Sequence, residues 1–172
     1  MSTAYRIGDY EFSSRELRDL LVAWLALGGA FTIFFLVSDS RPVRLGLNLF
    51  FPFGVSLLTA GVAFLLHEVA HKVVAVNYGQ EAEFRADYGM LFLAIMSAML
   101  GFIFAAPGAV YHYGNPTKRE NGHIAIAGPV MNLVLAVVFV PVYLGGLGLD
   151  FGLLATLGRF GIVVNLFLAA FN

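Results

Sequence analysis

The chain has 172 residues, of which 59% are apolar and only 12% are charged, and its mean hydropathy is +0.82. A water-soluble domain carries about a quarter charged residues, so most of this surface must face lipid. A formal net charge of −1 excludes the basic field that nucleic-acid binding needs. With 0 cysteines, the chain has neither disulfides nor thiolate metal sites. We therefore expect one membrane domain covering residues 1–172.

A polar N-terminal segment, residues 1–19, precedes four long runs without a charged residue. Crossing the bilayer core takes about 20 apolar residues, and long runs without period-2 alternation are helices rather than barrel strands. The runs predict transmembrane helices at residues 20–37, 45–66, 88–111 and 124–149. A fifth apolar stretch, residues 151–171, is interrupted by Arg159. The predicted fold is an all-α multi-pass membrane protein with four clear transmembrane helices and a short or truncated fifth.

The first apolar run is long enough to be a membrane helix and follows a charged segment, so no cleavable signal peptide is predicted. We expect the protein in the cell membrane, with lipid around it. Arginines lie on both sides of the first run, and those that precede it favour a cytoplasmic N-terminus when this first helix is given the most weight. They are Arg6, Arg15 and Arg18 before the run and Arg41 and Arg44 after it.

Two shorter patterns each leave two interpretations open. Ser13 and Glu16 have the spacing of a capping box, which would start the first helix within residues 13–15, or the match is accidental in a polar segment. Residues 77–87 connect the second and third helices as a surface loop or strand. Residues 81–88 alternate polar and apolar, which is the period of a strand with one apolar face. A small β element there and a solvated loop explain that alternation equally well.

Polar residues interrupt the second apolar segment as His67-Glu68-Val69-Ala70-His71-Lys72. Charge within a span costs at least about 2.5 to 3.5 kcal/mol, so these residues are candidates for function. His67 and His71 lie four residues apart on one helix face, where each can give a ring nitrogen to Zn²⁺. Glu68 lies beside them, where its carboxylate can serve as general base toward a water on the metal.

A structural explanation of the same residues is an ion pair between Glu68 and Lys72, which also have helical i, i+4 spacing. In that case the histidines would only hydrogen-bond nearby carbonyl groups. This explanation accounts for the two charges but not for two stacked histidines, so the metal site is the stronger interpretation.

Two further motifs accompany this one: Ala-Pro-Gly-Ala-Val at residues 106–110 and Gly-x-Ile-Ala-Ile-Ala-Gly-Pro-Val-Met-Asn at residues 122–132. With them the chain resembles the site-2 protease family of intramembrane zinc metalloproteases, in the compact form found in archaea and bacteria. The resemblance covers most of the chain. It implies a metalloendopeptidase that cleaves a transmembrane protein substrate, with His67 and His71 as zinc ligands and Glu68 as catalytic base.

In enzymes of this family a sheet near the site holds the substrate in extended form. The alternating segment could provide such an edge strand by pairing its main chain with the substrate. The candidate substrate-binding residues are Glu83, Phe84, Arg85 and Ala86.

The resemblance also implies a third zinc ligand, an aspartate in a Leu-Asp-Gly motif on a later helix, and the sequence has no such motif. Residues 164–172 look like the lead-in to it, so we expect a chain truncated just before the third ligand. Other acidic residues and histidines in loops are expected to be solvated surface groups, and two asparagines within apolar segments are expected to form interhelical hydrogen bonds. The surface groups are Glu81, Glu83, Asp87, Glu120, Asp150, His112 and His123; the asparagines are Asn132 and Asn165.

Two other functions remain open from the sequence. A catalytically incomplete membrane adaptor of the same fold is favoured by the missing aspartate and disfavoured by the intact Glu68. A metal or ion transporter would distribute ionisable residues over several spans, whereas here they concentrate on one helix.

Overall fold

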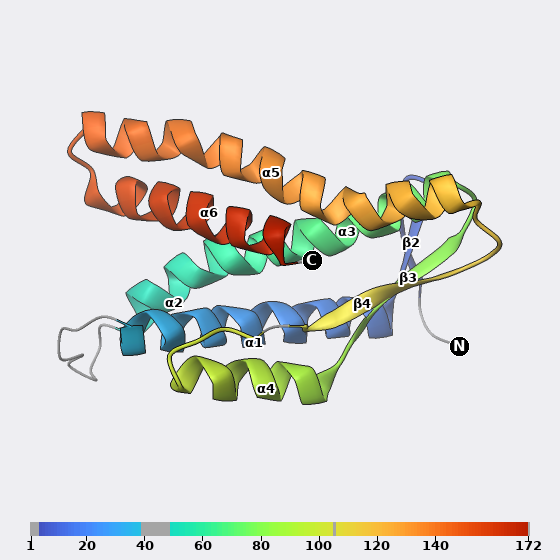
Figure 1. Cartoon of the computed structure of the whole chain (residues 1–172), viewed down its shortest axis with the longest axis horizontal. Coiled ribbons are helices and arrows are strands. Elements are labelled where there is room, and N and C mark those ends of the chain that lie inside the picture. Colours follow the sequence, from blue (N-terminus) through green and yellow to red (C-terminus); the bar gives the residue numbers. More distant parts are fainter. Residues whose placement is uncertain (1–3, 39–48, 105, 172) are drawn as a thin grey trace.

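The computed structural model describes residues 4–38, 49–104 and 106–171. Within them, 4 helical segments are long and apolar enough to cross a membrane (Figure 1). They are α1 (Ser14–Ser38), the continuous segment Phe50–Asn77, α5 (Lys118–Gly148) and α6 (Gly152–Ala170). A fifth apolar helix, α4 (Tyr88–Met99), is shorter. The prediction of an all-α multi-pass membrane protein is confirmed.

The segment Phe50–Asn77 is one helix with a change of pitch inside it. It comprises α2 (Phe50–Ser56), a π-helical turn η2 (Leu57–Gly61) and α3 (Val62–Asn77). The indole nitrogen of Trp24 on α1 donates to the carbonyl of Leu57 at 3.1 Å. This contact fixes α1 against the segment that leads into α3.

The short helix is the third of the chain and not the fifth, which corrects our assignment of the spans. Residues 88–111 hold no charge, but α4 ends at Met99 because Gly101 adopts a left-handed φ of 82° that favours glycine at a helix end. The chain then forms a strand, β4 (Gly108–Tyr113). Conversely, α6 continues through Arg159, whose side chain is exposed on the helix surface. An exposed arginine on a helix can carry its charge to the interface.

Two small antiparallel sheets lie toward the end of the molecule where α1 begins and α3 ends (Figure 1). β1 (Ala4–Ile7) and β2 (Tyr10–Ser13) form a hairpin within the predicted polar N-terminal segment. β3 (Glu81–Ala86) pairs with β4, with Phe84 opposite Val110. The strand interpretation of the alternating segment is therefore confirmed.

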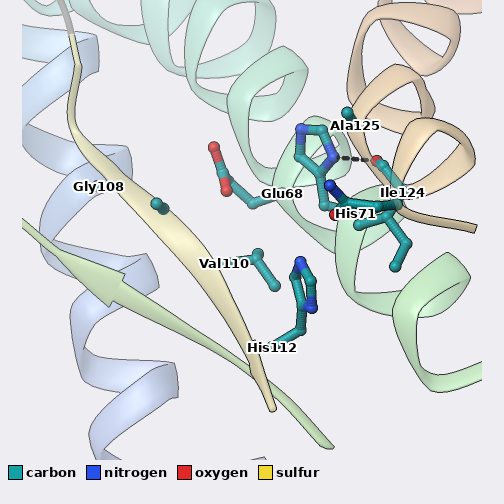
Figure 2. Close-up of a pocket in the computed structure, with 9 residues that line it drawn as sticks. Glu68, His71, Gly108, Val110, His112, Ile124 and Ala125 are labelled. Carbon is teal, nitrogen blue, oxygen red and sulfur yellow. Dashed lines mark hydrogen bonds between the residues drawn. The ribbon is translucent and has the colours of Figure 1, made fainter. Parts of the chain in front are cut away.

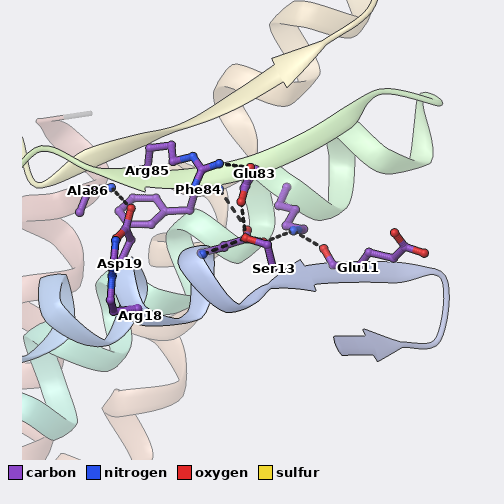
Figure 3. A network of polar contacts seen from close by, with 10 residues as sticks. Glu11, Ser13, Arg18, Asp19, Glu83, Phe84, Arg85 and Ala86 are labelled. Atoms are coloured by element: carbon purple, nitrogen blue, oxygen red, sulfur yellow. Dashed lines mark hydrogen bonds and ion pairs between the residues drawn. The ribbon is translucent and has the colours of Figure 1, made fainter. Parts of the chain in front are cut away.

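Carboxylates at the start of α1 hold one edge of β3. One oxygen of Glu16 accepts the N–H of Phe84 at 3.0 Å, and Asp19 accepts the N–H of Ala86 at 3.4 Å and the hydroxyl of Tyr88 at 2.8 Å. Both carboxylates are buried. Figure 3 shows Asp19 and its neighbours on α1 facing the residues of β3. β3 thus pairs with β4 on one edge and with α1 side chains on the other.

Lys72 connects α3 to the same network. Its Nζ lies 2.6 Å from the second oxygen of Glu16, 2.6 Å from the carbonyl oxygen of Glu11 and 4.1 Å from the ring centre of Phe12. The side chains of Lys72 and Glu16 are only 3% and 1% exposed. The alternative of a Glu68–Lys72 ion pair is wrong, because the partner of Lys72 is an acidic residue of another helix.

The capping prediction at the start of α1 is right in its position. α1 begins at Ser14, and the hydroxyl of Ser13 accepts the N–H of Glu16 at 3.0 Å. The carboxylate of Glu16 does not complete a capping box, because it binds Lys72 and β3. Glu16 has the spacing of a capping residue, but its carboxylate forms contacts with distant parts of the chain instead.

Glycines let α6 lie close along α5. A Cβ atom would overlap the backbone of Ala155 at Gly146, the backbone of Tyr143 at Gly158 and the ring of Phe139 at Gly161. The outward face of α5 carries exposed apolar side chains, as expected of a helix that faces lipid. They include Val130, Leu133, Val134, Val137 and Val138.

The buried pair between Lys72 and Glu16 predicts a large loss of stability when one partner is removed. Lys72→Met leaves the Glu16 carboxylate buried without its counter-charge, and we expect the free energy of unfolding to fall by about 3 to 5 kcal/mol. Lys72→Met combined with Glu16→Gln removes both charges and should recover most of the loss. Unfolding of the detergent-solubilised variants measures both effects.

Arg18 offers the control for this experiment, because its side chain is 62% exposed although it pairs with Asp19 at 3.2 Å. Arg18→Met should leave the unfolding midpoint unchanged. Equal losses in Arg18→Met and Lys72→Met would contradict the importance of the buried pair.

Candidate metal centre

His67 and His71 lie one turn apart on α3 and turn the same nitrogen toward each other. Their Nε2 atoms are 3.0 Å apart, and the ring planes meet at 76°. Two nitrogens at about 2.0 to 2.1 Å from a tetrahedral metal ion would be about 3.3 Å apart. The two rings therefore fit a shared metal ion after a displacement of a few tenths of an ångström.

Gly128 of α5 makes room for this pair. A Cβ atom at that position would overlap the Nε2 atoms of both histidines. Any larger residue would thus occupy the space in front of the two nitrogens. The Ala-Gly-Pro part of the motif at residues 122–132 has a direct structural reason, because it lets the backbone of α5 approach the histidines.

The same stretch of α5 also contacts the outer nitrogen of each ring. Nδ1 of His71 lies 2.7 Å from the carbonyl oxygen of Ile124. Since a carbonyl only accepts, His71 carries its proton on Nδ1 and its Nε2 has a lone pair for a metal. Nδ1 of His67 lies 3.0 Å from the amide nitrogen of Asn132, which is fully buried. The expectation of an interhelical hydrogen bond is confirmed for Asn132. For Asn165 it is wrong, because that amide donates to the carbonyl of Gly161 in its own helix at 2.8 Å.

Glu68 lines a cavity of about 230 Å³ together with His71. Figure 2 shows its carboxylate and the rings of His71 and His112 around this space, with β4 along one side. The start of α5 closes the opposite side through Asn121 and Ile124. A buried carboxylate beside an imidazole in a cavity of this size can hold and orient a water molecule.

Four residues of β4 line the cavity: Ala109, which is exposed, and the half-buried Gly108, Val110 and His112. The main-chain groups of Gly108, Val110 and His112 point to the outer edge of the sheet. This follows from the register, because Phe84 and Ala86 stand opposite Val110 and Gly108 yet give their N–H groups to α1. The edge of the sheet beside Glu68 therefore belongs to β4.

The predicted substrate-binding residues lie on β3, one strand further from Glu68. Phe84 is buried against Phe64, with ring centres 5.6 Å apart. Glu83 and Arg85 form an ion pair at 2.5 Å, and Ala86 donates to Asp19. A role of these four residues in substrate binding stays a prediction, and β3 reaches the cavity only through β4.

His112 was predicted to be a surface histidine, and that expectation is wrong. Its side chain is half-buried and lines the cavity with Glu68, and its Nδ1 is buried without a hydrogen-bond partner. The sequence did contain a signal, because His112 is at even spacing from Gly108 in a segment that forms a strand. His123, by contrast, lies at the surface and contacts the hydroxyl of Tyr78 at 2.6 Å.

Other acidic side chains have local roles. Asp87 caps α4 by accepting the N–H of Met90 at 2.9 Å, and Glu120 forms a capping box with Thr117 at the start of α5. Within residues 4–38, 49–104 and 106–171, no three side chains of the types His, Asp and Glu come together as a metal site.

A protein of Methanocaldococcus jannaschii, named "Putative zinc metalloprotease MJ0611", is 40% identical to this chain over 165 residues. The match covers 95% of this chain and 79% of the relative. The chain belongs to this family of zinc metalloproteases. No family model and no solved structure matches the chain. In a zinc metalloprotease family, His-Glu-x-x-His on a helix is the arrangement that binds the metal and supplies a base.

The contact at Gly128 predicts that Gly128→Ala removes metal binding. The added methyl group would lie where the two Nε2 atoms are, so the rings must turn away from each other. We expect the purified variant to contain less than about a tenth of the zinc of the unmodified protein, because the two rings can no longer point at one metal ion. Elemental analysis of the detergent-solubilised protein measures this content.

Gly122→Ala is the matched control, because Gly122 also lies on α5 and has open space where a Cβ would be. It should bind zinc like the unmodified protein. Normal zinc content in Gly128→Ala would show that the space before the two nitrogens does not matter for the metal.

Proposed function

We propose that the protein is an intramembrane endopeptidase of the site-2 protease type, which hydrolyses a peptide bond in or near a transmembrane segment of a substrate protein. The observation that carries this proposal is the group of buried His67 and Glu68 with half-buried His71 on a membrane-spanning helix, beside a cavity and a strand edge. A metal-dependent hydrolase needs all three features in one place. An adaptor that only holds other helices has no use for the buried Glu68.

His67 and His71 would hold the zinc through Nε2. The contacts to Ile124 and Asn132 support this assignment, because they engage the outer nitrogens and leave the inner ones facing each other. When bound, zinc polarises the scissile carbonyl group and makes a water molecule more acidic.

Glu68 would act as the general base. Its carboxylate accepts a proton from the attacking water, whose oxygen forms the new bond to the scissile carbonyl carbon. The same carboxyl group then returns the proton to the nitrogen of the departing amine, so that the C–N bond breaks without a charged leaving group. Burial of Glu68 excludes bulk water that would otherwise compete for this proton.

The substrate would be held by β4 rather than by β3. A peptide bond within a helix is protected by its own hydrogen bonds, so the substrate must be extended before it can be cleaved. The outward N–H and C=O groups of Val110 and His112 offer a strand edge beside Glu68. The carboxylates of Glu16 and Asp19 support this arrangement from the far edge of β3.

The site would lie near one face of the membrane. α3 ends at Asn77, less than three turns after Glu68, and the sheets gather at the same end (Figure 1). This end also contains the start of α1. The cytoplasmic N-terminus that Arg6, Arg15 and Arg18 favour would thus place the site toward the cytoplasmic face; Arg41 and Arg44 lie outside the described residues.

The role of Glu68 is tested by Glu68→Gln, which keeps the size of the side chain and removes the base. We expect the turnover rate on a model transmembrane substrate to fall by about 10² to 10⁴-fold, while the zinc content stays the same. Glu81→Gln is the control, because Glu81 is exposed at the far end of β3. Cleavage by Glu68→Gln at the normal rate would remove Glu68 from the reaction.

The role of the β4 edge is tested by Val110→Pro, which deletes the outward N–H next to the cavity. Proline is tolerated on the open edge of a sheet, so the fold and zinc content should be retained. We expect kcat/KM to fall at least about tenfold, the cost of a lost buried hydrogen bond. Val110→Ala keeps the N–H and should cleave normally. If both variants cleave equally well, the substrate does not pair with β4 at Val110.

A further inference from the structure

His112 is a cavity residue whose ring nitrogen Nδ1 makes no hydrogen bond. Its side chain is half-buried, it lines the cavity with Glu68, and its Nδ1 is buried without a partner. Figure 2 shows its ring directed from β4 into the space beside Glu68 and His71. A buried polar group without a partner costs stability, so its place in a cavity calls for a functional explanation.

Peptide hydrolysis places negative charge on an oxygen atom. When the oxygen of water bonds to the scissile carbonyl carbon, an electron pair of the C=O bond moves onto the carbonyl oxygen. Glu68 takes the proton of the water, and an ionised carboxylate has no hydrogen to donate to that oxygen. A donor that faces the charged oxygen stabilises the transition state more than the substrate. The cavity should therefore contain a donor apart from Glu68.

Among the described residues that line the cavity, three have side-chain N–H groups: His71, His112 and Asn121. Both nitrogens of His71 already have neighbours, since Nδ1 lies 2.7 Å from the carbonyl oxygen of Ile124 and Nε2 lies 3.0 Å from Nε2 of His67. Asn121 is exposed at the start of α5, where water can solvate its amide. His112 is left as the half-buried donor of this group.

His112 also lies at a suitable place along β4. Its main chain belongs to the strand edge on which we place the substrate. Side chains directly opposite on paired strands have Cβ atoms about 4.5 to 5.5 Å apart, so the ring of His112 can reach a substrate on this edge. A neutral imidazole has one N–H group and a protonated imidazole has two. Because Nδ1 has no partner that would hold the proton there, the ring can donate through Nε2.

We propose that His112 is a further catalytic residue, which donates a hydrogen bond from Nε2 to the oxygen of the scissile carbonyl group. This inference rests on the proposed function. The N–H bond of His112 stays intact: the proton of the water goes to Glu68, and the electron pair on the oxygen re-forms the C=O bond when the C–N bond breaks. His112 therefore accelerates the chemical step and has little effect on substrate binding.

Three substitutions of His112 test this role. The side-chain nitrogen of glutamine lies about as far from Cα as Nε2 of histidine, and that of asparagine about as far as Nδ1. On a model transmembrane substrate, we expect kcat to fall about 10² to 10³-fold in His112→Leu and His112→Asn, which lack a donor at the position of Nε2. In His112→Gln the loss should be less than about tenfold. KM should stay nearly the same in all three variants.

A phosphonate peptide gives a readout that does not depend on turnover, because its tetrahedral anionic group resembles the transition state. Calorimetry on the detergent-solubilised protein measures its dissociation constant. We expect binding about 10² to 10³-fold weaker in His112→Leu and His112→Asn, and a change of less than about tenfold in His112→Gln. The zinc content should equal that of the unmodified protein in all three variants, because His112 is not a proposed ligand.

His123→Leu is the control, because His123 is an exposed histidine that contacts Tyr78 and does not line the cavity. It should leave kcat and phosphonate binding unchanged. Three results would each overturn the inference while the proposed function stands: normal kcat in His112→Leu, equal losses in His112→Gln and His112→Leu, or loss of zinc in His112→Leu. Absence of cleavage by the unmodified protein would instead overturn the proposed function, and the inference with it.

Discussion

The close approach of α5 to α3 at Gly128 is the contact on which the site depends. Two imidazoles on a helix with apolar surroundings need hydrogen-bond partners for their outer nitrogens within the protein, and another helix supplies them. α5 does so from one stretch of sequence, with the carbonyl of Ile124, the missing side chain at Gly128 and the amide of Asn132. These three positions are four residues apart and therefore lie on one face of α5.

A second constraint is the buried charge of Lys72, one residue after His71. Its partner Glu16 uses one oxygen for the ammonium group and the other for the main chain of β3. One carboxylate thus fixes the distance between α3 and the sheet. Since an unpaired charge is costly in an apolar interior, α1, α3 and β3 cannot separate without exposing it.

The sheet places the edge of β4 beside Glu68 and His71, which line the cavity. In the proposed reaction this joins the two requirements of proteolysis in a membrane, an extended substrate and an activated water. α5 completes the cavity and also carries the lipid-facing surface, so the site is closed by a helix whose other side is in the bilayer.

The sequence by itself determined the membrane class and the candidate ligands, because both depend on local patterns. A long run without charged residues indicates that the segment lies in lipid. A spacing of four residues places His67 and His71 on one helix face whatever surrounds them. The sequence did not predict which apolar segment is short. Residues 88–111 contain no charge, and only the turn at Gly101 and the pairing of β4 end that helix early.

Contacts between distant residues were decided by the tertiary structure alone. Lys72 and Glu16 are 56 residues apart, so the helical spacing of Lys72 from Glu68 suggested the wrong partner. His112 was expected at the surface because it lies in the polar segment after the third predicted span, and the cavity that it lines forms only where β4 meets α3 and α5. Local spacing determines which side chains share a face of a helix. Packing determines which residues that face contacts, and the hydrogen-bond partners of His67, His71 and Lys72 depend on this packing.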